Sequence, residues 1–332
     1  MMNTAVVYMY IYYMRRTITL KKVFIDGSAG TTGLRIYQRL SARTDLKLVT
    51  LPEPLRKDPA ARREALNGCD AAFLCLPDEA AREAVSLIEN DHVAVLDTST
   101  AHRTQPGWAY GFPELGAEFR ERLLTSKRIA VPGCHASGFI ALTAPLVQAG
   151  LLPADARLTC HSITGYSGGG KKMIAQYQDP ERDPLLDAPR QYGLTQNHKH
   201  LKEMQAICGL HRAPVFCPIV SDFYSGMVVT VPLFREDLAP GVTAEDIRDL
   251  YRARYAGPVV RYREQMEEAG FLSGAGLSGK DAMELTVCGN EERILLLARY
   301  DNLGKGASGA AIQCLNLALG CDPTAGLELE TT

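Results

Sequence analysis

The segment KKVFIDGSAGTTGLRIYQRL (21–40) constrains the fold of this 332-residue chain more than any other. A short β-rich run, Val23-Phe24-Ile25, leads into three glycines, and apolar residues then recur at helical spacing. A strand followed by a glycine-rich turn and an amphipathic helix places the helix against a buried strand. The segment therefore predicts the start of an α/β domain.

Strands and short helices continue to alternate beyond this unit. Strands that are joined by helices pair in parallel, so we expect a doubly wound, Rossmann-like sheet. Asp78 is the expected N-cap of the second of the later helices. The predicted strands cover 46–51, 71–77 and 93–99, and the predicted helices cover 60–66 and 78–88.

The pattern of the sequence changes after residue 134. Several β-rich runs alternate between apolar and polar residues, and one helical pattern lies between them, which predicts an α+β domain with a largely antiparallel sheet. At the end of the chain, GKGASGAAIQCLNLAL (304–319) predicts a helix that follows a glycine-rich turn. The strands are expected at 156–164, 214–220, 226–234 and 293–301, and the helix between them at 243–255.

Residues 2–14 are apolar and aromatic and are followed by Arg15 and Arg16. A secretory signal carries its positive charge before the apolar stretch, and this stretch is too short to span a bilayer as a helix. We therefore expect residues 1–20 to form a leader outside the fold, with an edge strand or a partner-binding arm as the alternative. No other segment approaches membrane length.

Composition argues against several classes of function. The net charge of −2 gives no support for a nucleic-acid partner. The nine cysteines form no CxxC pair, which is typical of reduced thiols in the cytoplasm. Apart from His198 and His200, no cluster has the spacing of zinc ligands, so we expect no metal.

The glycine-rich turn predicts a dinucleotide site. Its glycines allow a pyrophosphate to approach the backbone, and the N–H groups of the next helix then face the anion. The spacing GxxGxxG differs from the usual GxGxxG, and a tight turn without a ligand is the alternative. Near the second strand, Glu53 would suit the ribose of NAD, whereas Arg56 and Lys57 would suit the 2′-phosphate of NADP. The turn comprises Gly27, Ser28, Ala29, Gly30, Thr31, Thr32 and Gly33.

Cys134 differs from the other cysteines in its setting, AVPGCHASGFIAL (130–142). The Pro-Gly pair before it forces a sharp entry into a helical run, so the sulfur lies near a helix N-terminus, where the dipole favours a thiolate. This setting favours a nucleophile over a buried apolar cysteine. Pro145 lies too deep for an uninterrupted helix, and we expect a bend or an end near Ala144.

Two further segments carry residues that a thiolate enzyme could use. In QNHKHLKEM (196–204), His198 and His200 have the pKa of an acid or base, although two residues at this spacing do not share a helix face. A polar surface turn is the alternative there. In HSITGYSGGGKKM (161–173), the glycines and lysines would form either a flexible linker or a nest and cationic lid for an anion.

Together these segments resemble the N-acetyl-γ-glutamyl-phosphate reductase family, in its shorter type 2 branch, within the semialdehyde dehydrogenases. The resemblance runs from about residue 21 to residue 320. His135 and Ser137 after the cysteine, and Lys199 between the histidines, are similar to the type 2 pattern. The motifs that carry the resemblance are GSAGTTG, DTSTAHR (97–103), YGFPEL (110–115), PGC, SGGGKK, HKHLKE and DNLGKGASGAAIQCLNL (301–317).

The resemblance implies an activity: the NADPH-dependent reduction of N-acetyl-γ-glutamyl phosphate to N-acetylglutamate semialdehyde, a step of arginine biosynthesis that releases phosphate. Cys134 would displace the phosphate and form a thioester, NADPH would deliver a hydride, and His198 or His200 would transfer the proton. It also implies a cytoplasmic homodimer or homotetramer that is built through the second domain.

The family further implies binding residues. Asn302 and the GASG turn would seat the nicotinamide half of NADP, and Ser225-Gly226 stands where the longer branch has Arg-Gly. This change leaves open whether Arg103, Lys171, Lys172 or Lys199 binds the substrate carboxylate. Besides the first turn and Arg56, the expected cofactor-binding residues are Asn302, Gly306, Ser308 and Gly309. The expected substrate-binding residues are Arg103, Ser167, Gly168, Lys171, Lys199 and Glu203.

From these features we expect an NADP-binding domain at 21–134, a catalytic and oligomerisation domain at 135–300, and a C-terminal helix within 301–332 that returns to the first domain. Two other functions fit the same sequence. Another acyl-phosphate reductase, such as aspartate-semialdehyde dehydrogenase, would keep Cys134 and the glycine turn. A non-catalytic dinucleotide sensor would not need Cys134.

Overall fold

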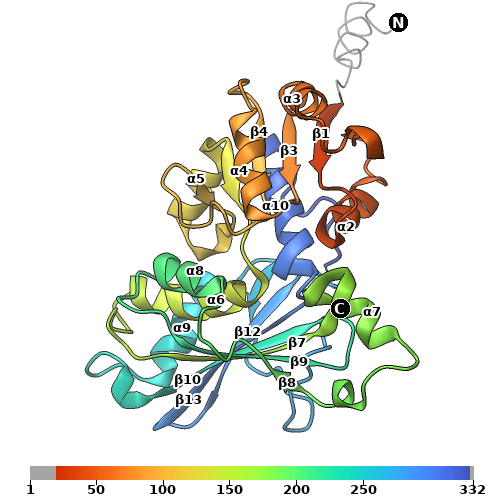
Figure 1. The fold of residues 1–332 in the computed structure, drawn as a ribbon. Coiled ribbons are helices and arrows are strands. Elements are labelled where there is room, and N and C mark those ends of the chain that lie inside the picture. Colours follow the sequence, from red (N-terminus) through yellow and green to blue (C-terminus); the bar gives the residue numbers. More distant parts are fainter. Residues whose placement is uncertain (1–19, 330–332) are drawn as a thin grey trace, which may run out of the picture.

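The computed structural model describes residues 20–329. The expectation for a leader at residues 1–20 therefore falls outside the described residues, except for Leu20. Two sheets, one above the other in Figure 1, organise the rest of the chain, with helices between them and around the upper one. No helix in this described range is long and apolar enough to cross a membrane.

The upper sheet has six strands, all parallel, in the order β2-β1-β3-β4-β6-β5. Its central strands are short apolar runs that are buried on both faces, as the strand–helix alternation predicts. The strands are β1 (Lys21–Asp26), β2 (Leu46–Val49), β3 (Ala71–Leu74), β4 (Ala94–Asp97), β5 (Ala109–Tyr110) and β6 (Arg128–Ala130).

Helices cover both faces of this sheet. Ile36 and Leu40 pack on one face together with the C-terminal helix, and Leu66 and Ala84 pack on the other. Asp78 is not the N-cap of its helix: Pro77 holds that position, and the Asp78 carboxylate instead accepts hydrogen bonds from Thr100 in the loop after β4. The helices are α2 (Thr31–Leu40), α3 (Pro59–Asn67), α4 (Asp78–Ser86), α5 (Ala117–Thr125) and α10 (Gly309–Leu319).

The lower sheet has seven strands in the order β11-β12-β13-β10-β7-β9-β8, and four of its six pairings are antiparallel. The fold class predicted from the sequence, a parallel doubly wound domain with an α+β domain, is confirmed. The strands are β7 (Thr159–Gly165), β8 (Arg190–Gln191), β9 (Val215–Ser221), β10 (Met227–Phe234), β11 (Val260–Tyr262), β12 (Met283–Gly289) and β13 (Arg293–Tyr300).

Helices cover the inner face of this lower sheet. This face packs under α6 (Cys134–Gln148) and α9 (Ala244–Arg254), and α6 and α8 (His200–Cys208) lie between the two sheets (Figure 1). The outer face exposes three apolar side chains, Val215 on β9, Ile163 on the adjacent β7 and Leu295 on β13, which β10 separates from β7. The same outer face also carries buried residues, among them Val228 and Thr286. The remaining helix, α7 (Gly170–Gln178), follows β7.

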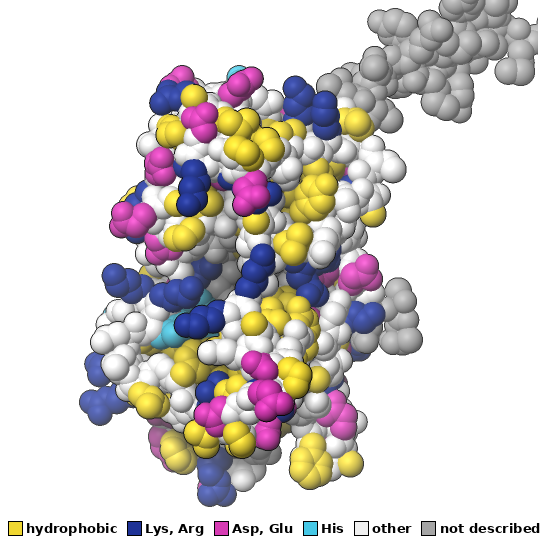
Figure 2. Space-filling model, turned by 45° about the vertical axis from the view of Figure 1, so that its right-hand side comes forward, with side chains coloured by type: hydrophobic (Ala, Val, Ile, Leu, Met, Phe, Trp, Pro, Cys, Tyr) yellow, Lys and Arg dark blue, Asp and Glu magenta, His cyan; other side chains and the backbone are white. Residues whose placement is uncertain are grey.

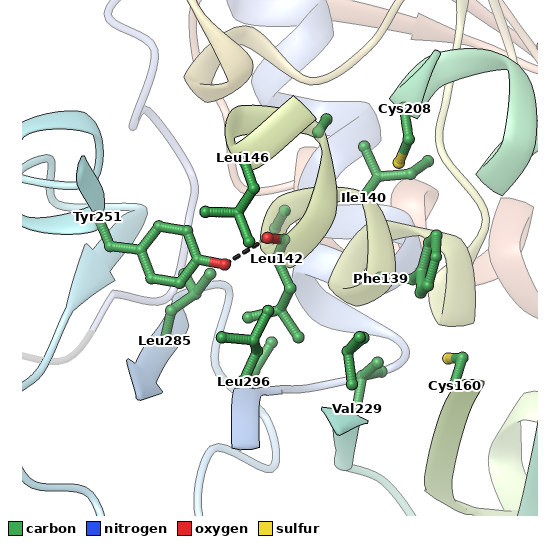
Figure 3. Close-up of a cluster of buried hydrophobic side chains, with 14 of the residues drawn as sticks. Phe139, Ile140, Leu142, Leu146, Cys160, Cys208, Val229, Tyr251, Leu285 and Leu296 are labelled. Atoms are coloured by element: carbon green, nitrogen blue, oxygen red, sulfur yellow. Dashed lines mark hydrogen bonds between the residues drawn. The ribbon is translucent and has the colours of Figure 1, made fainter. Parts of the chain in front are cut away.

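Helix α6 runs without a break past Pro145, so it does not end near Ala144. Proline has no N–H for the carbonyl of Ala141, four residues earlier. The structure satisfies that carbonyl from another helix, because the hydroxyl of Tyr255 donates to it at 2.6 Å. Tyr251 donates in the same way to the carbonyl of Leu142 (Figure 3). The Tyr255 hydrogen bond replaces the one that the proline removes, and the helix continues.

We predict that Tyr255→Phe lowers the free energy of unfolding by about 1–3 kcal/mol, because a buried carbonyl loses its donor. Urea denaturation followed by circular dichroism measures the change. Adding Pro145→Ala to the variant returns an N–H group to the Ala141 carbonyl and should recover part of the loss. Equal destabilisation with and without Pro145→Ala would contradict this explanation.

Candidate active site

The glycine-rich turn joins β1 to α2 at the edge of the parallel sheet. Gly27 adopts a positive φ of 83°, and a side chain there would collide with the backbone of Cys75 after β3. Helix α2 then begins at Thr31 with no acidic residue in its first turn. Its free N–H groups are therefore available to an anion, and the turn fits the pyrophosphate of a dinucleotide.

Cys134 is the first residue of α6, four residues after β6 ends at Ala130. Burial raises the pKa of its thiol, whereas the N–H group of His135 and the charges of Arg103 and Lys199 lower it. The net shift is upward, so the helix N-terminus alone does not produce the thiolate that the sequence suggests. A base is needed to remove the proton.

The carboxylate of Glu203 joins three segments just beneath Cys134. One oxygen accepts from the backbone N–H of Gly133 at 2.8 Å and from the hydroxyl of Tyr110 at 2.7 Å. The other accepts from Arg103 at 2.9 Å. Because the Glu203 side chain is buried and its oxygens are engaged in these bonds, we assign it to positioning rather than to direct substrate binding. Sequence reasoning placed Tyr110 in a motif but gave it no role.

Arg103 is also held on every side. Its Nε donates to the carbonyl of Val131 at 2.9 Å, and its second terminal nitrogen donates to the carbonyl of Thr98 at 3.0 Å. With Glu203 on the remaining nitrogen, the guanidinium has a fixed orientation beside the cysteine. The charge of Arg103 lowers the pKa of the Cys134 thiol. Its three hydrogen bonds go to groups of the protein.

Three histidine rings gather next to Cys134, since His135 lies 5.9 Å from His198 and 5.7 Å from His200 between ring centroids. His135 is fixed by Ser162 at 2.6 Å and by Tyr192 at 2.7 Å. Burial lowers its pKa to about 3, so it stays neutral and serves the packing of the site.

His198 and His200 do not lie on one regular helix. The rule that residues two positions apart face different sides of a helix therefore does not apply to this pair. His198 precedes α8, and its Nδ1 accepts the backbone N–H of His200 at 3.2 Å. His200 is buried against Gly133, where a side chain would collide with its Nε2. Its Nδ1 is buried without a hydrogen-bond partner in residues 20–329. Burial lowers the pKa of both rings, most strongly for His200, which is therefore a neutral base at neutral pH.

A cavity brings the predicted motifs together between the two domains. Figure 2 shows histidine side chains at the bottom of a hollow at mid-height, with lysine and arginine side chains around it. The first turn contributes Thr31 and Thr32, and a separate groove continues along this turn past Gly30. The sequence-predicted residues that line the cavity are Thr31, Thr32, Arg103, Cys134, Ser167, Gly168, Lys199, His200, Asn302 and Gly306.

A second cavity lies on the other side of Cys134. It shares Cys134, Gly168, Lys199 and His200 with the first cavity, and His198 lines only the second of these two. Its other walls come from the lower domain, and sequence reasoning missed several of them. They are His135, Thr164, Gly165, Gly169, Met173, Tyr192 and Val220.

The end of β13 supplies the wall opposite the first turn. Asn302 donates to Ser167 at 3.0 Å and accepts the N–H of Gly226 at 2.8 Å, so it holds the SGGG loop in place. The chain then forms a π-helical turn at Gly304–Ser308 before α10, where the sequence predicts one helix after a glycine-rich turn. Within this turn, Gly306 packs directly against Cys134.

Other predicted residues lie outside these cavities. Lys171 and Lys172 are exposed on α7 and line neither cavity. Ser308 donates to the backbone of Leu303, and Gly309 leaves room for the carboxylate of Asp281, so both support the turn. Arg56 lies beyond β2, where its Nε donates to the carbonyl of Leu51 at 3.2 Å. Four residues shape the first turn and do not line the first cavity: Gly27, Ser28, Ala29 and Gly33.

Comparison with known proteins places this architecture in one class. Semialdehyde dehydrogenase NAD binding domains match residues 55–122, and semialdehyde dehydrogenase dimerisation domains match residues 134–302. Aspartate semialdehyde dehydrogenase II from Vibrio cholerae, complexed with ASA, has a TM-score of 0.67 at 16% identity over 91% of this chain and 99% of that chain. Aspartate semialdehyde dehydrogenase with NADP from Candida albicans has a TM-score of 0.63 at 14% identity over 90% and 98%. The chain therefore has the semialdehyde dehydrogenase fold with a nicotinamide cofactor domain.

Closer relatives define the family. An N-acetyl-γ-glutamyl-phosphate reductase from Rhizobium meliloti (strain 1021) is 47% identical over 90% of this chain and 98% of its own length. N-acetyl-γ-glutamyl-phosphate reductase 2 from Nostoc sp. is 43% identical over 92% and 99%. The chain belongs to the N-acetyl-γ-glutamyl-phosphate reductase family, and the resemblance found in its motifs is confirmed.

Proposed function

We propose that this chain reduces N-acetyl-γ-glutamyl phosphate to N-acetylglutamate semialdehyde with NADPH and releases phosphate, as a step of arginine biosynthesis. One observation carries the proposal: Cys134 forms a common wall between a cavity beside the dinucleotide turn and a second cavity in the lower domain. A nucleophile in this place meets an acyl group from one side and a hydride donor from the other. A dinucleotide sensor would have no use for the second cavity.

Thr31, Thr32, Asn302 and Gly306 would hold the cofactor, because they line the first cavity from both sides. When bound, the nicotinamide supplies a hydride to the thioester carbonyl carbon. NADP is favoured over NAD by the residues after β2. The strand ends at Val49, Glu53 follows only in an exposed turn at Glu53–Leu55, and Arg56 is anchored nearby.

His200 is the proposed base for Cys134. It is neutral and buried beside Gly133, and it lines both cavities. The thiol gives its proton to His200, and the thiolate attacks the acyl carbon, so that a C–S bond forms while the C–O bond to phosphate breaks. His200 then protonates the leaving phosphate. After hydride addition, the oxygen reforms the carbonyl and expels the Cys134 thiolate. Because His200 gave its first proton to the phosphate, it takes up a second proton from solvent and passes it to the thiolate.

Lys199 is the proposed cation for the anionic groups of the substrate. It is exposed at the start of α8 and lines both cavities, whereas Lys171 and Lys172 line neither. Arg103 also lines the first cavity, but three of its five N–H groups donate to protein groups and fix its orientation. A mobile ammonium between the two cavities can follow the phosphate from its bound to its leaving position.

We also propose that two copies of the chain pair through the outer face of the seven-stranded sheet, as a dimer or as half of a tetramer. Apolar side chains on β7, β9 and β13 are exposed on this face, and exposed apolar residues on a sheet face can mark an interaction site. All nine cysteines are free, which supports a reducing compartment, the cytoplasm.

The reverse reaction tests the proposed function. We expect purified protein to reduce NADP in the presence of N-acetylglutamate semialdehyde and phosphate, measured by the absorbance of NADPH, and to do so faster than with NAD. Cys134→Ala should have no detectable activity. Phosphate-dependent reduction with aspartate semialdehyde alone would assign the chain to the other enzyme, and binding of NADP without any turnover would favour the sensor.

His200→Asn should lower kcat by about 10²–10⁴-fold, the usual contribution of general acid–base catalysis. His198→Asn is the matched variant, and we expect a fall of less than about tenfold, because His198 lines only the second cavity and its hydrogen bond goes to the backbone N–H of His200. Since burial lowers the pKa of His200, the acid limb of the wild-type pH–rate profile should lie below about pH 6.5. A larger effect of His198→Asn would reverse the assignment.

Ile163→Lys should halve the assembly, from dimer to monomer or from tetramer to dimer, because it places a charge on the outer sheet face. Sedimentation velocity measures the mass of each species. Leu124→Lys, at an exposed apolar position on α5, is the control and should leave the mass unchanged. A monomeric wild-type protein would contradict the proposed interface.

A further inference from the structure

The first turn of α6 contains a side chain from another strand. The hydroxyl of Tyr300, the last residue of β13, accepts the backbone N–H of Gly138 at 2.9 Å and donates to the carbonyl of Cys134 at 2.6 Å. In a regular α-helix these two backbone groups are partners of each other. A hydroxyl between them is one of the recognised ways to open a helical turn.

The Tyr300 hydroxyl fits beside α6 because position 138 carries no side chain. A side chain on Gly138 would lie 2.6 Å from the Tyr300 oxygen and 2.7 Å from Val229. Tyr300 itself is fully buried in the central part of the lower sheet, where it pairs with Met227 and Met283 on the neighbouring strands. The hydroxyl is therefore held by the sheet, and the helix adapts to it.

The contact acts on the peptide group that joins Cys134 to His135. Its carbonyl oxygen accepts from Tyr300. Its N–H group belongs to His135 and lowers the pKa of the Cys134 thiol. A donor on the oxygen of an amide polarises the amide and strengthens the bond that its N–H donates. The three groups thus form a chain from the hydroxyl through the peptide to the sulfur.

We propose that Tyr300 is a positioning residue that stabilises the thiolate of Cys134 through this peptide group. The inference rests on the proposed role of Cys134 as the nucleophile. Tyr300 touches neither cavity, so it acts only through the backbone. Burial raises the pKa of Tyr300 well above its usual value, which keeps the hydroxyl protonated as a donor throughout the working range.

Other charged groups also shift the pKa of the Cys134 thiol, and they are the same in the wild type and in Tyr300→Phe. Arg103, from the loop after β4, and Lys199, at the start of α8, favour the thiolate, whereas Glu203 on α8 opposes it. His200 lines the same two cavities as Cys134, and burial keeps its ring neutral. Tyr300→Phe changes none of these groups and removes only the oxygen.

Tyr255→Phe provides a matched control. It removes another buried tyrosine hydroxyl that donates to a carbonyl of α6 at the same 2.6 Å, but near Pro145 instead of Cys134. Both variants should lose stability. Only Tyr300→Phe should change the behaviour of the thiol.

The experiment measures the rate of Cys134 alkylation by iodoacetamide against pH in intact protein, with the Cys134 peptide quantified by mass spectrometry. We expect Tyr300→Phe to lower the thiolate fraction about fivefold and kcat by a similar factor with KM unchanged, the size of one net hydrogen bond. The Tyr255→Phe profile should superimpose on that of the wild type. A Tyr300→Phe profile that also superimposes would overturn the proposal.

A second variant keeps the side chain in place if Tyr300→Phe does not fold. Site-specific 3,5-difluorotyrosine at position 300 is a stronger donor of nearly the same shape, and it should raise the thiolate fraction instead. No change, or a decrease, would contradict the inference. Because alkylation does not depend on turnover, a shifted thiol with no reductase activity would reject the proposed function and leave the role of Tyr300 intact.

Discussion

The buried carboxylate of Glu203 is the contact on which the rest of the active site depends. A carboxylate out of water is stable only when donors surround it, and here the donors come from three separate segments. The bond to Gly133 fixes the residue before Cys134, the bond to Arg103 fixes the loop after β4, and the bond to Tyr110 fixes β5. Because α8 carries both Glu203 and His200, the same contact brings the proposed base to the cysteine.

Helix α6 has a similar dependence on side chains from the lower domain. Most of its residues are buried, so its backbone groups have little access to water. Three tyrosine hydroxyls supply donors to its carbonyls, Tyr300 at the cysteine end and Tyr251 and Tyr255 near Pro145. The helix that presents the nucleophile is thus shaped by hydrogen bonds from outside it, and its geometry is a property of the whole domain.

The sequence pattern predicted most of the fold because the residues that indicate each strand and helix lie within a short stretch of the chain. Buried parallel strands read as apolar runs, and their helices follow within a few residues. The two failures each have a partner that is distant in the sequence. Pro145 does not end α6, since Tyr255 satisfies the carbonyl that the proline leaves free. Asp78 does not cap α4, since its carboxylate binds Thr100, 22 residues away. In both cases a tertiary partner overrides a sound local rule.

The sequence by itself determined the class of the protein, the glycine turn and the setting of Cys134, because each depends on residues that adjoin in the chain. Only the tertiary structure distinguished His200 from His198, separated Lys199 from Lys171 and Lys172, and revealed Tyr110 and Tyr300. The histidines and lysines differ in which cavities they line. The hydrogen bonds of Tyr110 and Tyr300 join residues between 93 and 166 positions apart. A single sequence carries no periodicity at such distances, so only the packing of the folded chain determines these contacts.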